Sequence, residues 1–235
     1  MNPNNTDPVS LLEGRILYED NHLLILNKRN GEIVQGDQSG DKPLLELARD
    51  YIRVVGNKPG NVFCGLVHRL DRPVSGAVIF AKTSKGLSRM NELIKKREID
   101  KIYWAIVEGR PKQSEGHLIQ YLFRNEKTNK SYVSETEKDG WQRAELKYKV
   151  LAFSDRYSVL EVTLLTGRHH QIRAQLSAMG CPIKGDLKYG ARRSNEDGSI
   201  SLHARRVAFE HPVAHEPIDV MAEPFNNLFV KILNS

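Results

Sequence analysis

The sequence has few cysteines, and it lacks long apolar runs, internal repeats and low-complexity segments. Only Cys64 and Cys181 occur among 235 residues, which is too few for a disulfide framework, and neither lies in a zinc-binding spacing. No stretch approaches the roughly 18 uninterrupted apolar residues that cross a membrane. Residues 1–14 also lack the basic start and apolar run of a secretory signal. We therefore expect a soluble, cytoplasmic protein with no membrane partner.

Several motifs of nucleotide and metal chemistry are missing as well. The chain has no P-loop, GxGxxG turn, HExxH helix, GxSxG elbow or EF-hand loop, so nucleotide hydrolysis, dinucleotide redox chemistry and zinc hydrolysis lose most of their support. Three of the eight histidines, His203, His211 and His215, lack carboxylate or cysteine companions at ligand spacing. His169 and His170 are adjacent, which would direct them to different faces of a helix. We expect no metal site.

What is present is an ordinary globular composition, with 40% apolar and 27% charged residues. Helical spacing of apolar residues predicts helices over 44–55, 85–97 and 168–180. Strands are predicted over 16–18, 23–26, 62–68, 76–83, 101–109, 144–153 and 157–166. The polar region 111–140 lacks a sustained period, and its KTNKS segment, residues 127–131, is predicted to be an exposed excursion. We expect an α+β fold in which one catalytic domain, residues 15–235, follows an N-terminal tail of residues 1–14. Its central sheet should be mixed, largely antiparallel and flanked by short helices.

Positive charge is concentrated in one segment. The whole chain has 35 basic and 29 acidic residues, a formal charge of +6. Residues 165–193 alone contain six of these basic residues and one acidic residue, hence +5. Such a segment indicates a polyanionic partner such as a nucleic acid, or else a solvated basic surface.

One carboxylate stands out, because Asp71 lies on a polar loop between two predicted strands. Such loops commonly carry reactive side chains on a rigid scaffold. Arg69 and Arg72 flank it and are expected to keep it ionised. Local sequence alone favours the alternative that Asp71 is a turn aspartate which caps its own backbone.

A resemblance to a known family changes this weighing. Residues 68–76, HRLDRPVSG, closely resemble the HRLDRxTSG signature of the RluA-type RNA pseudouridine synthases. Further motifs of the family are matched in the same order by NK at 27–28, KIYWA at 101–105, TGRHHQIR at 166–173, LHA at 202–204 and FEHP at 209–212. The sequence departs from the family's motifs at three places. Arg29 and Asn30 replace the proline-containing part of the motif NKPxG, Val74 replaces the usual threonine, and Gln175 stands where a histidine is common. The resemblance extends from about residue 15 to the end of the chain.

The resemblance implies an isomerase that converts a uridine of RNA to pseudouridine. The bond from ribose C1′ to uracil N1 breaks, the base turns, and C5 bonds to C1′, so no cofactor is required. Asp71 would be the catalytic carboxylate. Arg173 would pair with it, and Tyr103 would lie against the uracil ring and assist removal of the C5 proton. Whether Asp71 attacks the base, attacks the sugar or removes a sugar proton stays open.

The same resemblance indicates how RNA would be held. A stacked uridine must be extruded before reaction, and the planar guanidinium of Arg69 is expected to fill the gap. Contacts to phosphates are expected from Arg72, Arg168, Lys184, Lys188, Arg192 and Arg193. The expected substrate is a structured stem-loop of transfer or ribosomal RNA, bound by a monomer. The S4 RNA-binding domain of many relatives has no room in the 14 residues before the first strand, so substrate selection should rest with the catalytic domain.

Two other functions remain open at this point. The chain could be a catalytically silent RNA-binding or RNA-folding module on the same scaffold. It could also be a hydrolase that uses Asp71 as a glycosidase-like nucleophile, although no second carboxylate has an evident place in the matched motifs. The products separate the three: isomerised uridine, unchanged RNA, or free uracil.

Overall fold

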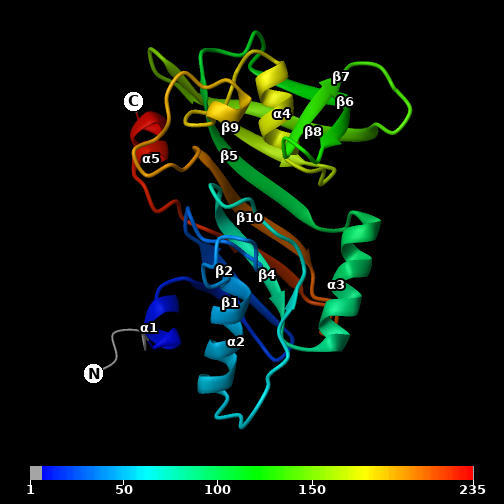
Figure 1. Ribbon diagram of the computed structural model, residues 1–235, viewed down its shortest axis with the longest axis vertical. Coiled ribbons are helices and arrows are strands. Elements are labelled where there is room, and N and C mark those ends of the chain that lie inside the picture. Colours follow the sequence, from blue (N-terminus) through cyan, green and yellow to red (C-terminus); the bar gives the residue numbers. More distant parts are fainter. Residues whose placement is uncertain (1–6, 235) are drawn as a thin grey trace. The chain divides into compact units, whose positions relative to one another are not determined.

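The computed structural model describes residues 7–234, which form two compact units (Figure 1). Unit 1 contains the residues up to Ile99 together with Val207–Glu223. Unit 2 contains Asp100–Arg206 and the residues from Pro224 onward. Strand β10 (Leu202–Glu210) therefore begins in unit 2 and ends in unit 1.

Unit 1 is a small antiparallel sheet with three helices. Its strands are β1 (Ile16–Glu19), β2 (Leu23–Lys28), β3 (Gly65–Leu66), β4 (Ser75–Ala81) and β11 (Pro217–Met221). Its helices are α1 (Pro8–Leu12), α2 (Leu44–Val55) and α3 (Ser84–Lys96). Strand β2 pairs antiparallel with β1 and β4, β3 pairs with β4, and β11 pairs with β10. Helix α1, within the segment expected to be a tail, buries Leu12 completely.

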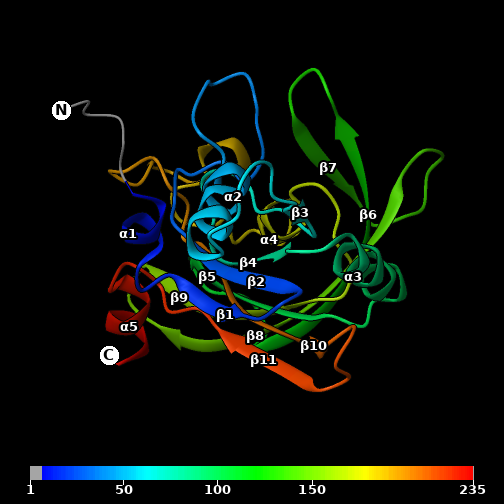
Figure 2. The same ribbon diagram turned by 90° about the horizontal axis from the view of Figure 1, so that it is seen from below.

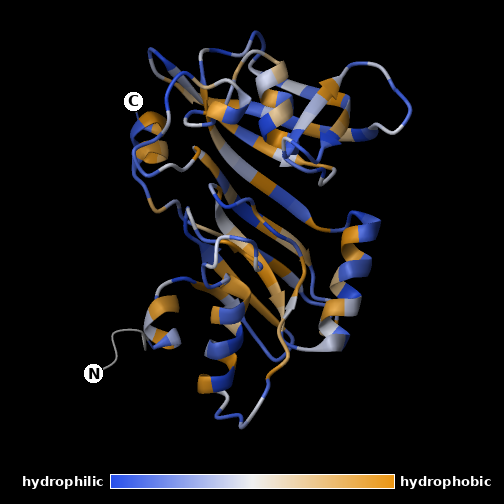
Figure 3. Cartoon of the chain, in the orientation of Figure 1, coloured by the Kyte–Doolittle hydropathy of each residue, from blue (hydrophilic) through white to orange (hydrophobic). Residues whose placement is uncertain are grey.

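Every residue of β2 and β4 is buried. Alternate residues of both strands, such as Leu23, Ile25 and Ile79, pack in one cluster with Met90 of α3. Figure 3 shows apolar and polar residues on both α2 and α3, as expected for helices that cover a core with one face. The two strands thus form a rigid base for the loops at their ends.

Unit 2 is a longer antiparallel sheet. Its strands are β5 (Asp100–Glu108), β6 (Glu115–Asn125), β7 (Lys130–Ser134), β8 (Gln142–Phe153) and β9 (Tyr157–Leu164), in the order β5-β9-β8-β6-β7. Helix α4 (Gln171–Ala178), the 3₁₀ turn η1 (Leu187–Tyr189) and helix α5 (Leu228–Leu233) complete it. Leu122 of β6 and Ala174 of α4 share a small core, and α5 packs Phe229 and Ile232 against Ile106 and Val159.

The predicted α+β class with a largely antiparallel sheet and short helices is confirmed. Region 111–140, where no element was predicted, contains the β6–β7 hairpin (Figure 2). The exposed excursion predicted for KTNKS is its turn: residues 127–129 are exposed, whereas Ser131 is buried. The strand predicted for 62–68 is limited to Gly65 and Leu66. Within the described residues no helix is long and apolar enough to cross a membrane.

The third predicted helix begins later than expected. His170 precedes α4 with a left-handed φ of 52°, so the helix starts at Gln171 instead of residue 168. The rings of His169 and His170 stack with centroids 3.7 Å apart. The expectation that they point to different helix faces is therefore wrong, since neither lies within the helix.

Candidate active site

Asp71 lies in the loop that joins β3 to β4 in unit 1. Its side chain is partly buried, between the buried residues Leu70 and Val74 and the exposed arginines Arg69 and Arg72. The backbone N–H of Val74 donates to the carbonyl oxygen of Asp71 at 3.0 Å, which closes a turn. The apolar residues fix the loop on the sheet, so the carboxylate is held where a ligand can reach it.

Lys28, the last residue of β2, anchors this loop from below. Its side chain is fully buried, and Nζ donates to the carbonyl oxygens of Val74 at 2.6 Å, Arg29 at 3.0 Å and Arg72 at 3.1 Å. The N–H of Gly31 also donates to the Arg72 carbonyl at 2.9 Å. All three ammonium hydrogens are thus used on backbone, and two of them hold the turn that contains Asp71.

The surroundings of Lys28 shift its acidity. Burial lowers the pKa of the Lys28 ammonium to about 7, and the carboxylates of Glu32 and Asp71 oppose this shift. Asp71 is therefore electrostatically coupled to a buried cation as well as flanked by exposed ones. Sequence analysis named Lys28 only as part of a motif. The available sequence signal was that Lys28 follows the apolar run of residues 23–26 by only two positions. A lysine buried at such a place needs several hydrogen-bond acceptors around it.

Two further residues of the signature have identifiable roles. The Nε2 atom of His68 accepts from the N–H of Ile79 at 3.3 Å, which ties the start of the loop to β4. Arg72 forms an ion pair with Asp41, and both side chains are about half exposed. An exposed ion pair contributes at most about 1 kcal/mol. An anionic ligand that displaced Asp41 from Arg72 would therefore lose little stabilising energy.

Tyr103 and Lys101 lie in β5 of unit 2. Tyr103 is 7% exposed and opposite Val162 of β9. Lys101, two residues earlier, projects to the same side of the strand. Burial lowers the pKa of its ammonium. The sequence motif KIYWA thus places a desolvated lysine beside the tyrosine that was predicted to contact the base.

Arg173 is held in one orientation within unit 2. It lies on α4, is 6% exposed, and donates from Nε and Nη2 to the two carboxylate oxygens of Asp186 at 2.7 and 2.9 Å. Its guanidinium carbon is 5.1 Å from the centre of the Tyr189 ring. The Tyr189 hydroxyl in turn accepts from the N–H of Ser131 at 2.8 Å and contacts Nδ1 of His170 at 3.0 Å. These contacts fix the position and orientation of the Arg173 guanidinium.

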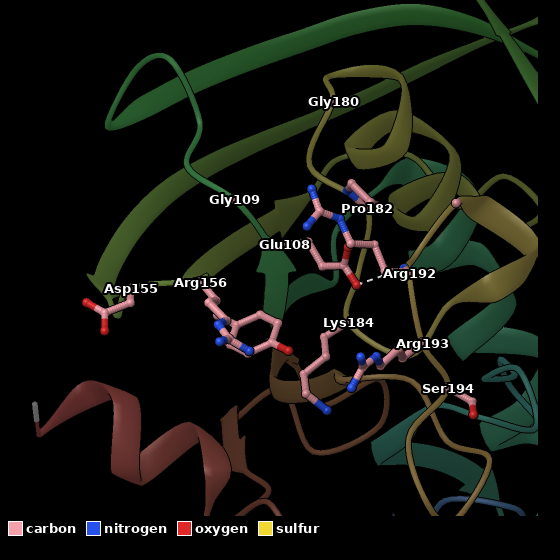
Figure 4. A pocket seen from close by; sticks show the side chains of 12 residues that line it. Glu108, Gly109, Asp155, Arg156, Gly180, Pro182, Lys184, Arg192, Arg193 and Ser194 are labelled. Carbon is pink, nitrogen blue, oxygen red and sulfur yellow. Dashed lines mark hydrogen bonds and ion pairs between the residues drawn. The ribbon is translucent and has the colours of Figure 1, made fainter.

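Three of the predicted RNA-binding cations line one pocket of unit 2. Lys184, Arg192 and Arg193 surround a cavity of about 740 Å³ together with Arg156 and Ser194 (Figure 4). The backbone N–H of Arg192 donates to Glu108 at 3.0 Å, and its side chain, which is 91% exposed, forms a long ion pair with the same carboxylate at 3.9 Å. With Glu108 and Asp155 as the acidic lining residues, the pocket carries a net charge of +2 and suits an anionic group such as phosphate.

The other two predicted cations of the basic segment do not line this pocket. Lys188 donates to the carbonyl oxygen of Asn129 at 3.1 Å, and Arg168 donates to that of Arg143 at 3.0 Å. Arg156, in the turn between β8 and β9, is a pocket residue that the sequence analysis missed. It lies outside the charged segment, so no local signal marked it. No group of three or more potential metal ligands occurs within residues 7–234.

Comparisons with known proteins place this arrangement in a family. The model of the family described as RNA pseudouridylate synthase matches residues 22–178. Ribosomal large subunit pseudouridine synthase C of Vibrio vulnificus is 30% identical over 233 residues, which cover 97% of this chain and 70% of that protein. An uncharacterised RNA pseudouridine synthase of Bacillus subtilis is 34% identical over 213 residues, covering 89% and 68%.

The fold agrees with these matches. The structure of human RNA pseudouridylate synthase domain containing 4 superposes with a TM-score of 0.78 at 24% identity, over 96% of this chain and 94% of that chain. The chain therefore belongs to the RNA pseudouridylate synthase family, and within it to the RluA type. It is an isomerase that converts uridine to pseudouridine in RNA. The matched segment contains Asp71, Tyr103 and Arg173.

Proposed function

We propose that Asp71 is the catalytic carboxylate and that the enzyme acts on a specific uridine in a structured stem-loop of ribosomal or transfer RNA. The observation that carries this proposal is the position of Asp71 on a loop fixed by Lys28 and flanked by two exposed arginines. A carboxylate that must react with an extruded nucleoside needs both a fixed position and access from solvent.

The reaction needs no group from outside. The N1–C1′ bond breaks, a C5–C1′ bond forms, the proton leaves C5, and N1 gains a proton. Asp71 acts as nucleophile or base at the start of this sequence. Tyr103 contacts the base and assists removal of the C5 proton, and Arg173 keeps the reacting carboxylate charged. These two roles rest on the family resemblance, and the Asp186 contacts of Arg173 support the second because they fix the guanidinium.

The names of the relatives favour one substrate class. Several of them, including those of Vibrio, are named for the ribosomal large subunit. We therefore favour large-subunit ribosomal RNA over transfer RNA. Arg69 takes the place of the extruded base, while Arg72, Arg168, Lys188 and the cations of the unit 2 pocket contact phosphates.

Replacement of Asp71 by asparagine tests the catalytic assignment. Asp71→Asn keeps the shape of the side chain but removes the carboxylate, so pseudouridine formation should be lost while RNA affinity stays within about tenfold of wild type, because phosphate contacts supply most of the affinity. Asp50→Asn, which alters a carboxylate of α2 that pairs with Lys42, is the matched control and should retain turnover. Pseudouridine made by purified Asp71→Asn would refute the assignment.

Product analysis and mapping test the rest. Release of free uracil would identify a hydrolase, and unchanged RNA with retained binding would identify a silent module. Mapping of pseudouridine in total RNA from cells with and without the protein should reveal sites that disappear in large-subunit ribosomal RNA. Sites that disappear only in transfer RNA would contradict the favoured substrate class. Complementation with wild type, but not with Asp71→Asn, should restore the sites.

A further inference from the structure

The β6–β7 hairpin of unit 2 exposes two large aromatic side chains side by side. Phe123 of β6 and Tyr132 of β7 are direct partners in the antiparallel register, so both project from the same face of the hairpin. They are 42% and 44% exposed. Single exposed apolar residues are ordinary in soluble proteins, whereas contiguous exposed apolar patches are typical of binding surfaces.

A third ring and two cations extend this surface. The indole of Trp141, in the turn before β8, lies 5.7 Å from the Phe123 ring with planes tilted by 32°. Lys138 Nζ is 5.0 Å from the Trp141 ring centre, and Lys130 Nζ lies at the edge of the surface, 6.0 Å from the Tyr132 ring centre and 5.3 Å from that of Tyr189. We call Phe123, Tyr132 and Trp141 the aromatic platform. Proteins that bind single-stranded nucleic acids commonly do so with exposed aromatic rings, on which bases stack, and with neighbouring positive charges.

The platform is supported from behind. Leu122, on the opposite face of the hairpin, packs with Ala144, Ala174 and Tyr189. The Ser131 hydroxyl donates to the carbonyl oxygen of His169 at 2.7 Å, next to helix α4. Figure 2 shows the hairpin as a two-stranded arm of the unit. Because these contacts hold its strands, little conformational entropy is lost when a ligand binds the rings.

We propose that the aromatic platform stacks unpaired bases of the RNA substrate. This inference rests on the proposed RNA substrate and identifies a surface that binds it. Bases offer flat faces to the three rings, and the phosphates that accompany them supply counter-charges for Lys130 and Lys138. Exposed rings with ammonium groups beside them match a ligand that offers both flat bases and phosphates, so RNA is the occupant that we propose.

Trp141 supplies a direct readout of stacking. The protein has two tryptophans, and the other, Trp104, lies in a different contact, with Arg205 at 4.6 Å and Phe229 at 6.1 Å. A single-stranded oligouridylate of about ten nucleotides should quench Trp141 fluorescence, whereas an abasic strand of the same length and charge should not. Quenching should persist in Trp104→Phe and vanish in Trp141→Phe. Equal quenching by both strands, or quenching that survives in Trp141→Phe, would overturn the proposal.

Affinity for the same oligouridylate gives an independent test. Phe123→Ala combined with Tyr132→Ala should weaken binding about tenfold or more, the effect of losing one or two stacked bases. Tyr132→Phe should keep most of the affinity, because the ring face remains. Ile119→Ala is the matched control, since Ile119 is on β6, on the same face and 42% exposed, but is not part of the platform. If Ile119→Ala weakens binding as much as the double variant, a general apolar effect replaces stacking.

The outcomes separate this inference from the proposed function. Wild-type protein that forms pseudouridine but shows no base-dependent quenching would overturn the platform and leave the function intact. Base-dependent quenching without pseudouridine formation would support the platform and contradict the proposed function. A concentration-dependent rise in molar mass by light scattering, abolished by Phe123→Ala, would identify the platform as a contact between copies of the chain and overturn the proposal. Thermal unfolding of each variant shows whether the fold is retained.

Discussion

The two units expose their strands in different ways. In unit 1 every residue of β2 and β4 is buried, so these two strands offer a ligand only the loops at their ends. In unit 2 buried and exposed residues alternate along much of β6 and β8, so one face of these strands is open. A strand buried on both faces can fix a single reactive group, whereas an open face can bind an extended ligand.

The charges follow the same division. The cation that holds the Asp71 loop is Lys28, which is buried and fully hydrogen-bonded. The cations of the unit 2 pocket include Arg192, which is almost completely exposed. We therefore expect changes in the Asp71 loop to alter turnover more than RNA affinity, and changes on the surface of unit 2 to alter affinity more than turnover. Three predictions test this difference, from the largest expected effect to the smallest.

Replacement of Lys28 should have the largest effect. Lys28→Met leaves the carbonyls of Arg72 and Val74 without their buried donor, which should lower the free energy of unfolding by about 1–3 kcal/mol. Because the turn around Asp71 loosens, kcat should fall at least tenfold with little change in RNA affinity. Lys85→Met, an exposed lysine of α3, should change neither quantity. Reduced RNA affinity with normal kcat would contradict the division between the units.

The same variant has a pH signature. The pKa of Lys28 is about 7 in the folded protein, against an ordinary value of 10.5. Between these values the unfolded chain binds more protons than the folded one, so the stability contributed at this position rises with pH. The unfolding free energy of wild type should therefore increase relative to Lys28→Met from pH 7 to pH 9. Parallel pH profiles from denaturant titrations would show that Lys28 remains charged in the fold.

Arg69 tests the difference between the units in another way. It lies on the Asp71 loop of unit 1, but its proposed role is to replace the uridine that is extruded from the RNA stem. Arg69→Ala should lose tenfold or more activity on a folded stem-loop and far less on an RNA whose target uridine is already unstacked, since extrusion has no cost there. Arg69→Lys should restore little, because an ammonium cannot stack. Equal losses on both RNAs with rescue by lysine would mean that Arg69 only supplies charge beside Asp71.

The smallest expected effect concerns the pocket cations of unit 2. Arg192→Gln combined with Arg193→Gln should reduce the slope of log affinity against log salt concentration by about one to two units, because each phosphate contact contributes about 0.7–0.9. Lys42→Gln combined with Lys58→Gln in unit 1 removes the same charge and should have less effect. Equal changes in slope would show that RNA binding is spread over both units.

The spacing of apolar residues correctly predicted the helices and strands that have a single buried face. Helix α2 has the predicted bounds, because Leu44, Leu47, Ala48 and Ile52 lie on one side and Pro43 precedes the first turn. The β6–β7 hairpin escaped the same procedure because Phe123 and Tyr132 point outward. With apolar residues on both faces of the hairpin, the alternation of polar and apolar residues is lost.

The family signature pointed to Asp71, but no local pattern could reveal what surrounds the candidate residues. Lys28 is 43 residues from Asp71 in the sequence, and its three carbonyl partners carry no side-chain signal. Asp186 is 13 residues from Arg173, and nothing in the spacing distinguishes it from a surface aspartate. Contacts of this kind join residues that are distant in the sequence. Sequence patterns can therefore identify candidate residues but not the residues that these contact in the fold.

The division of β10 between the units also has a consequence for synthesis of the protein. Residues that complete the core of unit 1 are supplied long after its first part, by Val207, Phe209, Ile218, Val220 and Ala222. A growing chain that has emerged from the ribosome up to Ile99 thus contains Asp71 but lacks part of the core beneath it. At about 5–20 residues per second, the missing strands follow after roughly 6–25 seconds. Strands β5 to β9 of unit 2 can form in this interval, whereas helix α5 of that unit is synthesised only afterwards. The scaffold of the proposed catalytic loop is therefore completed after most of unit 2 has been synthesised.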